Sequence, residues 1–375
     1  MMYFNPVKII FGESERQNIL KGLSDKNVLI VATSTSIERY KRDSKLADIF
    51  NQKNLTVESA FGTNPSLDDM NAISKKYIKK TFDHIVGIGG GSAMDVAKIA
   101  SISIPAFKNG IKIKDLLTDS SFFKGLKEID CTLVPTTAGT GSEVTPFATI
   151  WDYQNKQKKS LGHDSMFAKK AYVDPDFLKE IPADIALSTG LDSLNQAFES
   201  IWNKNANNLT RQLSIEAATL ALKSLPNLKN LSFDGSLREN LCNASLFAGL
   251  AISQTRTSIC HSISYPLTLK YGIDHGIACA FSMLEVYKYN SQFIKDDIES
   301  IKKNINIDPH ALLEEIFKQY KINQILKKYL PKKQKFTESI DDFISEGRFE
   351  NNIKDCKTSD LLKIINNSYD SVNEK

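Results

Sequence analysis

Four side chains with nitrogen and oxygen donors stand out in the second half of the sequence. Asp192 and Gln196 are four residues apart in STGLDSLNQAFES, so a helix would place them on one face. His261 and His275 follow about seventy residues later, fourteen residues apart. Together these four side chains could hold iron or zinc. The alternative is that both histidines are buried core residues and that Asp192 caps a helix, because buried imidazoles and capping acids are common.

A glycine-rich turn follows a buried strand expected at 84–89. The turn glycines are Gly89, Gly90 and Gly91. They would let the backbone approach a pyrophosphate, and the N-terminus of the helix expected from Ser92 onward would face its negative charge. Ser92 with Asp95 also fits a capping box, which would make that pair purely structural.

The loop PTTAGTGSEVT follows a second short apolar run and interleaves hydroxyl side chains with glycines. Thr136, Thr137 and the exposed amides beside them suit ribose and phosphate groups. The alternative is an ordinary loop of Ser, Thr and Gly without a ligand.

The hydrophobic period changes near residue 180. Before it, apolar runs such as KNVLIVAT, HIVGIGG and CTLVP alternate with helical stretches, which is typical of a wound parallel sheet. After it, apolar residues recur at helical spacing and no strand pattern is visible. We therefore predict a dinucleotide-binding α/β domain over residues 1–180 and an all-helical metal-binding domain over residues 181–375.

Length and composition fit two domains and argue against several other classes. The chain has 375 residues, of which 41% are hydrophobic, enough for two domains with cores. Its formal charge of +4 is too small to indicate a nucleic-acid-binding surface. Cys260 lies beside His261 and could touch a metal site, although a small buried apolar role is the alternative. The odd number of cysteines and the lack of CxxC favour reduced thiols. Without a signal sequence or an apolar run long enough for a bilayer, we expect a soluble, cytoplasmic protein with no membrane contact.

The sequence resembles the iron-containing (group III) alcohol dehydrogenases nearly from end to end. The motifs that carry the resemblance are NPVKIIFG, NPSLDDM, GGGSAMDVAK, PTTAGTGSEVT, YVDPDF, STGLDSL and DHG. The resemblance implies a Rossmann-like, dehydroquinate-synthase-like nucleotide domain, an all-α C-terminal domain, NAD(P)H, and a divalent metal, Fe(II) in the first place and zinc as the alternative. The implied metal positions are Asp192, Gln196, His261 and His275. The implied cofactor positions are Gly89, Gly90, Ser92, Asp95, Thr136, Thr137 and Lys158.

Two positions depart from the family pattern. Gln196 stands where a third histidine is common, and its amide oxygen is a harder and weaker donor than imidazole. Tyr265 stands four residues after His261, where another histidine is common, and would move a proton relay to a phenol. Pro266 follows directly, so we expect the helix to end or kink there. The alternative for Tyr265 is an aromatic residue packed in the core.

These departures look like the branch of the family described as phosphonoacetaldehyde reductases, which would place the protein in phosphonate biosynthesis. A phosphonate needs a cation, and Arg256 offers a bidentate fork, with Thr257 nearby. Arg256 lies five residues before His261, so on a shared helix the two side chains would point from different faces. Its alternative is a solvated surface arginine.

We therefore expect a metal-dependent oxidoreductase that uses NAD(P)H to reduce an aldehyde, phosphonoacetaldehyde, to a primary alcohol, 2-hydroxyethylphosphonate, with Tyr265 and Arg256 as catalytic residues. Thr33 replaces the aspartate that many NAD-preferring relatives carry, so NADPH should be tolerated. The alternatives are a general dehydrogenase of short-chain alcohols, a dehydroquinate-synthase-like lyase and a non-catalytic scaffold. A homo-oligomer is left open.

Overall fold

The computed structural model describes residues 3–43, 46–47, 50, 54–155, 157–333, 340–345 and 347–373. The chain divides into two compact units. The α/β unit consists of Asn5–Thr137 and Gly141–Phe177. The helical unit consists of Met1–Phe4, Ala138–Thr140 and Leu178–Lys375. The helical unit thus takes in two short segments from the first half of the chain.

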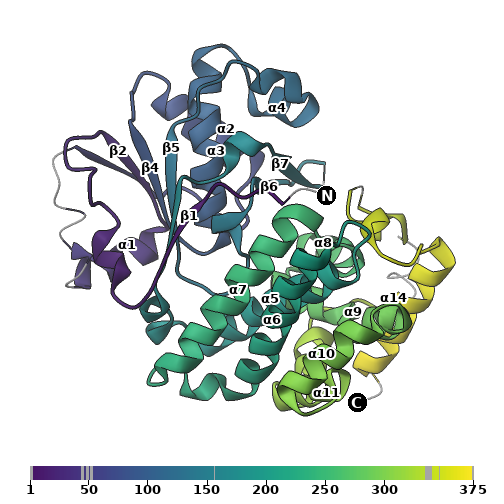
Figure 1. The fold of residues 1–375 in the computed structure, drawn as a ribbon. Helices are drawn as coiled ribbons and strands as arrows, with labels where there is room; N and C mark the ends of the chain where they lie inside the picture. Colours follow the sequence, from purple (N-terminus) through teal and green to yellow (C-terminus); the bar gives the residue numbers. More distant parts are fainter. Residues whose placement is uncertain are drawn as a thin grey trace. The chain divides into compact units, whose positions relative to one another are not determined.

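A parallel sheet forms the centre of the α/β unit (Figure 1). Within the described residues its strand order is β1-β8-β5-β4-β2-β3, and every neighbouring pair is parallel. The strands are β1 Lys8–Phe11, β2 Val28–Val31, β3 Leu55–Glu58, β4 His84–Gly89, β5 Asp130–Pro135 and β8 Lys170–Val173. Parallel strands buried on both faces read as continuous apolar runs, which is why β2 and β4 are visible in the sequence.

Helices cover both faces of this sheet. Alternate residues of one strand belong to different cores: Leu29 packs in the cluster that contains Met94 of α3, whereas Ile30 packs in the cluster that contains Tyr40 of α1. The helices of the unit are α1 Ser34–Arg42, α2 Leu67–Tyr77, α3 Gly91–Lys108 and α4 Ile113–Thr118. A separate antiparallel hairpin pairs β6 Phe147–Asp152 with β7 Gln157–Gly162.

The helical unit is built around α5, which packs against α6, α7 and α9. Its helices are α5 Ala183–Ile201, α6 Asn208–Ser224, α7 Gly235–Thr255, α8 Ile259–Tyr271, α9 His275–Asn290, α10 Lys295–Ile305, α11 Pro309–Gln319, α12 Ile322–Lys327 and α14 Thr358–Asn373. The C-terminal α14, drawn in yellow, lies against α9 (Figure 1). No helix in the described part of the chain is long and apolar enough to cross a membrane. These two units confirm the predicted fold class, an α/β domain joined to an all-α domain.

Pro266 does not end its helix, so one of the two outcomes expected from the sequence, an end or a kink, is wrong. Helix α8 runs from Ile259 to Tyr271 with the proline in its interior. Proline removes one backbone donor from a helix, but the tightly packed surroundings of α8, buried from Ile259 to Thr268, keep the backbone helical. Tyr265 and His261 therefore do lie on one helical face.

Candidate functional site

Helix α5 presents Asp192 and Gln196. Both side chains are buried, and their four-residue spacing places them on one face of the helix. The Gln196 Oε1 atom is buried and has no hydrogen-bond partner among the described residues. A buried amide oxygen in that state costs free energy unless a donor or a cation faces it. The Gln196 oxygen is therefore open to a cation.

Helices α8 and α9 bring the two histidines to Asp192. His261 Nε2 lies 3.3 Å from Asp192 Oδ1, and the ring centroids of His261 and His275 are 5.3 Å apart. His275 is the first residue of α9, and Gly276 follows it against α5. A Cβ atom at Gly276 would lie 1.7 Å from the backbone oxygen of Ser188, so only glycine permits this approach. The DHG motif is thus a packing requirement that positions a histidine.

A cysteine completes a compact group of donor atoms. Asp192, His261, His275 and Cys279 each offer one atom to a set in which all the atoms lie within 4.8 Å of one another. Cys279 Sγ is 3.9 Å from His275 Nε2, and the side chain is fully buried. The sequence prediction missed Cys279, although it follows His275 by four residues and so shares its helical face. Cys260, the cysteine that adjoins His261 in sequence, is not in this group.

Glu199 is a buried acid that orients His261. Its Oε2 accepts a hydrogen bond from His261 Nδ1 at 2.6 Å, and its Oε1 accepts from the His261 backbone N–H at 3.1 Å. Because a carboxylate only accepts, Nδ1 carries the hydrogen and Nε2 is left towards Asp192. Burial alone would lower the pKa of His261, but the neighbouring Cys279, Glu199 and Asp192 raise that pKa well above its ordinary value. Sequence reasoning missed Glu199, whose spacing of seven from Asp192 was the available signal.

This donor set fits a divalent metal ion. Carboxylate oxygen, imidazole nitrogen and thiolate sulfur are all ligands of zinc and iron, and a carboxylate that holds the far nitrogen of a histidine is a common outer partner of such sites. The structure brings together three of the four residues predicted as ligands, namely Asp192, His261 and His275. Gln196 shares the face of Asp192 on α5, and the ligand roles of all four stay predictions.

The two predicted catalytic residues, Tyr265 and Arg256, lie on different elements of the helical unit. The Tyr265 ring stacks on His275 with 6.2 Å between centroids and 19° between planes. Its hydroxyl oxygen accepts a hydrogen bond from Arg348 Nε at 3.3 Å. Arg256 lies in the turn after α7, not on a helix shared with His261, so the offset in helical steps was wrong. Its side chain is partly buried, and burial together with the charge of Arg348 lowers its pKa, so Arg256 is not a fully solvated arginine.

The nucleotide is predicted to bind at the carboxyl ends of β4 and β5, which we call the nucleotide cradle. These strands are neighbours, and the Thr136 N–H donates to the Gly89 carbonyl at 3.0 Å, so the two loops leave the sheet side by side. Gly89 has φ of 156°, and a Cβ atom there would lie 2.7 Å from the Ala93 Cβ. Glycine is therefore required by both backbone angle and packing. A Cβ atom on Gly90 would lie 3.3 Å from Thr137 Oγ1, so the two loops are in close contact.

The N-terminus of α3 fits an anionic group. The helix begins at Gly91, directly after the cradle, with Gly90 as its N-cap residue and no side-chain cap. The first N–H groups of any helix have no acceptor within the helix, and the positive end of its dipole favours negative charge. This arrangement fits the predicted pyrophosphate site.

The predicted capping box of Ser92 with Asp95 does not form. Ser92 Oγ accepts from the Asn64 N–H at 3.3 Å. Asp95 accepts from Ser142 Oγ at 2.7 Å and from the Thr149 N–H at 2.8 Å. Asp95 therefore holds the loop after β5 and the strand β6 in place, and the purely local role was wrong.

Lys98 lies beneath the same loop and is fully buried. Its ammonium donates to the carbonyl oxygens of Ser142 at 2.9 Å, Thr145 at 3.4 Å and Phe147. It also lies 3.4 Å from Asp95 Oδ1. Burial is the largest influence on Lys98 and lowers its pKa. The loop is thus tied together from inside by one cation.

Two further residues that the sequence analysis connected with the cofactor lie on other elements of the α/β unit. Thr33 is the N-cap residue of α1 and accepts from the Ser36 N–H at 3.3 Å. It follows β2, the neighbour of β4, so it belongs to the same carboxyl edge of the sheet. Lys158 lies on β7, with its Nζ 5.6 Å from the centre of the Trp151 ring.

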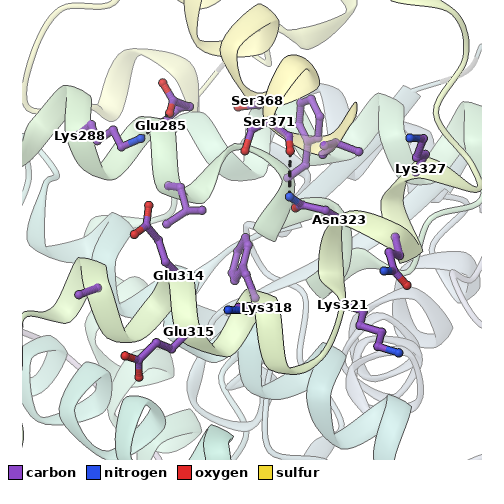
Figure 2. Close-up of a pocket in the computed structure, with 16 residues that line it drawn as sticks. Glu285, Lys288, Glu314, Glu315, Lys318, Lys321, Asn323, Lys327, Ser368 and Ser371 are labelled. Atoms are coloured by element: carbon purple, nitrogen blue, oxygen red, sulfur yellow. Dashed lines mark hydrogen bonds and ion pairs between the residues drawn. The ribbon is translucent and has the colours of Figure 1, made fainter. Parts of the chain in front are cut away.

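A pocket of about 720 Å³ lies elsewhere in the helical unit, where α9, α11, α12 and α14 meet (Figure 2). Its wall mixes apolar, acidic and basic side chains, and Asn323 Nδ2 donates to the Ser371 carbonyl at 2.9 Å (Figure 2). None of the residues predicted to hold metal or cofactor lines this pocket. The donor group around Asp192, and not this pocket, is the candidate metal centre.

Comparison with known proteins defines the class. The family model for iron-containing alcohol dehydrogenase matches residues 6–175, and the model for the C-terminal region of the Fe-containing alcohol dehydrogenase family matches residues 186–369. The chain therefore belongs to the iron-containing alcohol dehydrogenases, an oxidoreductase family.

Particular relatives carry more specific names. The chain is 33% identical to a phosphonoacetaldehyde reductase of Streptomyces viridochromogenes over 226 residues, which make up 60% of this chain and 57% of that protein. It is 26% identical to the NADPH-dependent butanol dehydrogenase of Clostridium saccharobutylicum over 366 residues, 92% of this chain and 91% of the relative. Among solved structures, sulfoacetaldehyde reductase from Bifidobacterium kashiwanohense in complex with NAD+ matches with a TM-score of 0.82 at 25% identity, covering 98% of each chain. The match with the Streptomyces protein thus spans little more than half of its length.

Proposed function

We propose that this protein is a metal-dependent NAD(P)H oxidoreductase that reduces an anionic aldehyde to a primary alcohol, with phosphonoacetaldehyde as substrate and 2-hydroxyethylphosphonate as product. The observation that carries the proposal is the buried donor group of Asp192, His261 and His275 with Tyr265 stacked against it. The reaction consumes one aldehyde, one NAD(P)H and one proton. It yields one alcohol and one NAD(P)+.

When bound, the ion supplies Lewis-acid polarisation of the carbonyl and the reduced nicotinamide supplies a hydride. Glu199 keeps the His261 ring in one orientation, with Nε2 towards Asp192. The Tyr265 hydroxyl donates the proton that the product oxygen needs. Arg348 Nε, 3.3 Å from the Tyr265 oxygen, stabilises the negative charge left there. Cofactor ribose hydroxyls or water are the other routes for that proton.

Arg256 supports the choice of an anionic substrate. A guanidinium that is partly removed from water binds a phosphonate more strongly than a solvated one does, because less water competes for the charge. Thr257 follows it in the same turn and is buried. Two relatives named for phosphonoacetaldehyde and sulfoacetaldehyde agree with this choice. The name of the butanol dehydrogenase supports the second candidate, a general dehydrogenase of short-chain alcohols.

The family models favour a dehydrogenase over the dehydroquinate-synthase-like lyase, and the compact donor group speaks against a non-catalytic scaffold. We further propose Fe(II) as the metal with zinc as the alternative, use of NADPH, and a cytoplasmic location in which the free cysteines stay reduced. A homo-oligomer remains part of the proposal.

The test is steady-state kinetics of the metal-loaded protein with NADPH and with NADH, on phosphonoacetaldehyde and on propanal. We expect a clear preference for phosphonoacetaldehyde. In the Arg256→Ala variant the loss of a charge-assisted contact should cost roughly 2 to 4 kcal/mol in kcat/KM for that substrate. Equal efficiency on both aldehydes would leave the general alcohol dehydrogenase as the function.

A further inference from the structure

Arg348 reaches the candidate site from a distant part of the sequence. It follows Gly347, 83 residues after Tyr265, and its side chain is 9% exposed. Nε donates to the Tyr265 hydroxyl at 3.3 Å and Nη1 donates to the Gly347 carbonyl at 3.1 Å. The guanidinium is thus held in a fixed orientation against the ring that stacks on His275.

The turn that carries Arg256 is held in place by its backbone. Arg256 has φ of 60°, a conformation that L-residues seldom adopt, and its carbonyl accepts from Asn203 Nδ2 at 3.2 Å. The adjoining Thr257 carbonyl accepts from Asn351 Nδ2 at 3.0 Å, which ties this turn to the segment that carries Arg348. Burial and the positive charge of Arg348 both lower the pKa of Arg256. The turn with Arg256 and the segment with Arg348 therefore lie side by side.

A guanidinium group that is largely removed from water binds an oxyanion through charge-assisted hydrogen bonds, and two such groups on one oxyanion add their attractions. The strained backbone at Arg256 is of a kind that is typical of ligand-binding positions. A phosphonate or sulfonate is tetrahedral, and a phosphonate carries up to about two negative charges, so two guanidinium groups match its shape and its charge.

We infer that Arg348 and Arg256 together form the binding site for the anionic end of the substrate, next to Tyr265 and His275. This inference rests on the proposed function and deepens it. It makes Arg348 a specificity-determining residue. Two other roles compete with this one: Arg348 supports Tyr265 alone, which would affect all aldehydes equally, or it only anchors the segment around Asn351 on helix α8.

The experiment compares kcat/KM for phosphonoacetaldehyde and for propanal in the wild type, Arg348→Gln, Arg348→Lys, Arg256→Gln and the double Gln variant, all metal-loaded. Arg348→Gln should lower the ratio of the two efficiencies by about 10-fold to 100-fold, mainly through a higher KM for the anionic aldehyde. Arg348→Lys keeps the charge without the fork, so its ratio should fall less. The double variant should lose less than the product of the single losses, because both residues contact one group.

A matched control is Arg238→Gln in the same unit. Arg238 is also buried, and it donates to the backbone carbonyls of Leu231 and Ser232. It lies near the start of α7, on the order of 27 Å of helix away from Arg256 at 1.5 Å per residue. This variant should keep the wild-type ratio. An equal fall of the ratio in Arg238→Gln and Arg348→Gln would overturn the inference.

A second measurement does not depend on turnover. Calorimetry of 2-hydroxyethylphosphonate binding to the metal-loaded protein with NADP+ should show weakening by about 10-fold or more in Arg348→Gln. If that variant loses its folded circular dichroism spectrum, Arg348→Lys and Arg256→Gln take its place. Unchanged product affinity and an unchanged ratio in a folded Arg348 variant would leave Arg348 a structural anchor.

Sulfoacetaldehyde and succinate semialdehyde are tested as further anionic substrates in the same kinetic comparison. If the wild type prefers one of these and the preference collapses in Arg348→Gln, the arginine pair is supported while phosphonoacetaldehyde is not the substrate. If the wild type prefers phosphonoacetaldehyde and Arg348→Gln keeps that preference, the proposed function stands and the arginine pair fails. A wild type without preference for any anionic aldehyde removes both.

Discussion

The nucleotide cradle and the donor group are both predicted to bind a charged ligand, and they differ in which parts of the chain would hold it. In the α/β unit the site consists of backbone groups. Two parallel strands end side by side, glycines leave room for a close approach, and the first turn of α3 supplies N–H groups. In the helical unit the site consists of side chains from α5, α8 and α9. Tertiary packing of these helices brings the donor atoms within 4.8 Å of one another. The cradle should therefore tolerate side-chain changes outside its glycines, whereas the donor group should tolerate few.

The largest effect is expected from His275→Ala. Removal of one imidazole from the donor group should release the metal and lower kcat/KM by at least about a thousandfold, because polarisation of the carbonyl depends on the ion. Elemental analysis and kinetics measure the two quantities. His310→Ala, on α11 outside the donor group, is the control and should keep both. Full metal content with wild-type kcat in His275→Ala would mean that the site lies elsewhere.

Glu199→Gln tests whether the donor group depends on its outer partner. The amide cannot accept both hydrogen bonds as a carboxylate does, so the His261 ring loses its fixed orientation. Metal affinity should fall by about 10-fold to 100-fold, measured by competition with a chelator. Glu216→Gln, on the exposed face of α6, should leave the affinity unchanged. No difference between these two variants would reduce Glu199 to a packing residue.

Thr33→Asp tests the cradle from the opposite direction. Aspartate is as good an N-cap as threonine, so α1 should keep its start, but the new carboxylate would repel a 2′-phosphate. The ratio of kcat/KM for NADPH over NADH should fall by about 10-fold to 100-fold. The neutral control is Thr33→Ser. A wild type that favours NADH more than a hundredfold would already contradict the expected use of NADPH.

The smallest effect is expected from exchanging Cys279 and Gln196, the donors other than Asp192, His261 and His275. Cys279→Ser should reduce zinc retention by about tenfold and abolish the thiolate charge-transfer absorption of the cobalt-substituted protein. Gln196→His should instead tighten metal retention, since imidazole is a stronger donor than an amide oxygen. Cys260→Ser, outside the group, is the matched control. If chelator sensitivity is the same in Gln196→His and the wild type, Gln196 is not a ligand; a cobalt spectrum without that absorption in the wild type excludes Cys279.

The two regions also differ in how far the sequence alone predicts them. The strands β2, β4 and β5 and the glycine turn are visible because continuous apolar runs and glycines are local signals. Asp192 and Gln196 are visible through their spacing on one helix. Arg348 is not, because its place in the site arises from a contact with Tyr265, 83 residues earlier in the chain. Cys279 could have been found, because it follows His275 by four residues on one helix.

Asp95 shows the converse error. A local capping pattern predicted a bond to Ser92, but the carboxylate bonds instead to Ser142, 47 residues away, and to Thr149. Pro266 is a similar case, in which a local rule against proline yields to the packing of α8.

Lys98 determines how the loop after β5 should behave when metal ions are removed from the protein. An ammonium surrounded by carbonyl oxygens does the work of a potassium ion, but it is covalently attached and cannot be dialysed away. The loop that follows β5 is therefore held by a cationic side chain of α3 and needs no bound metal ion. A chelator that empties the donor group should leave this loop in shape, and the apoprotein should still bind its dinucleotide.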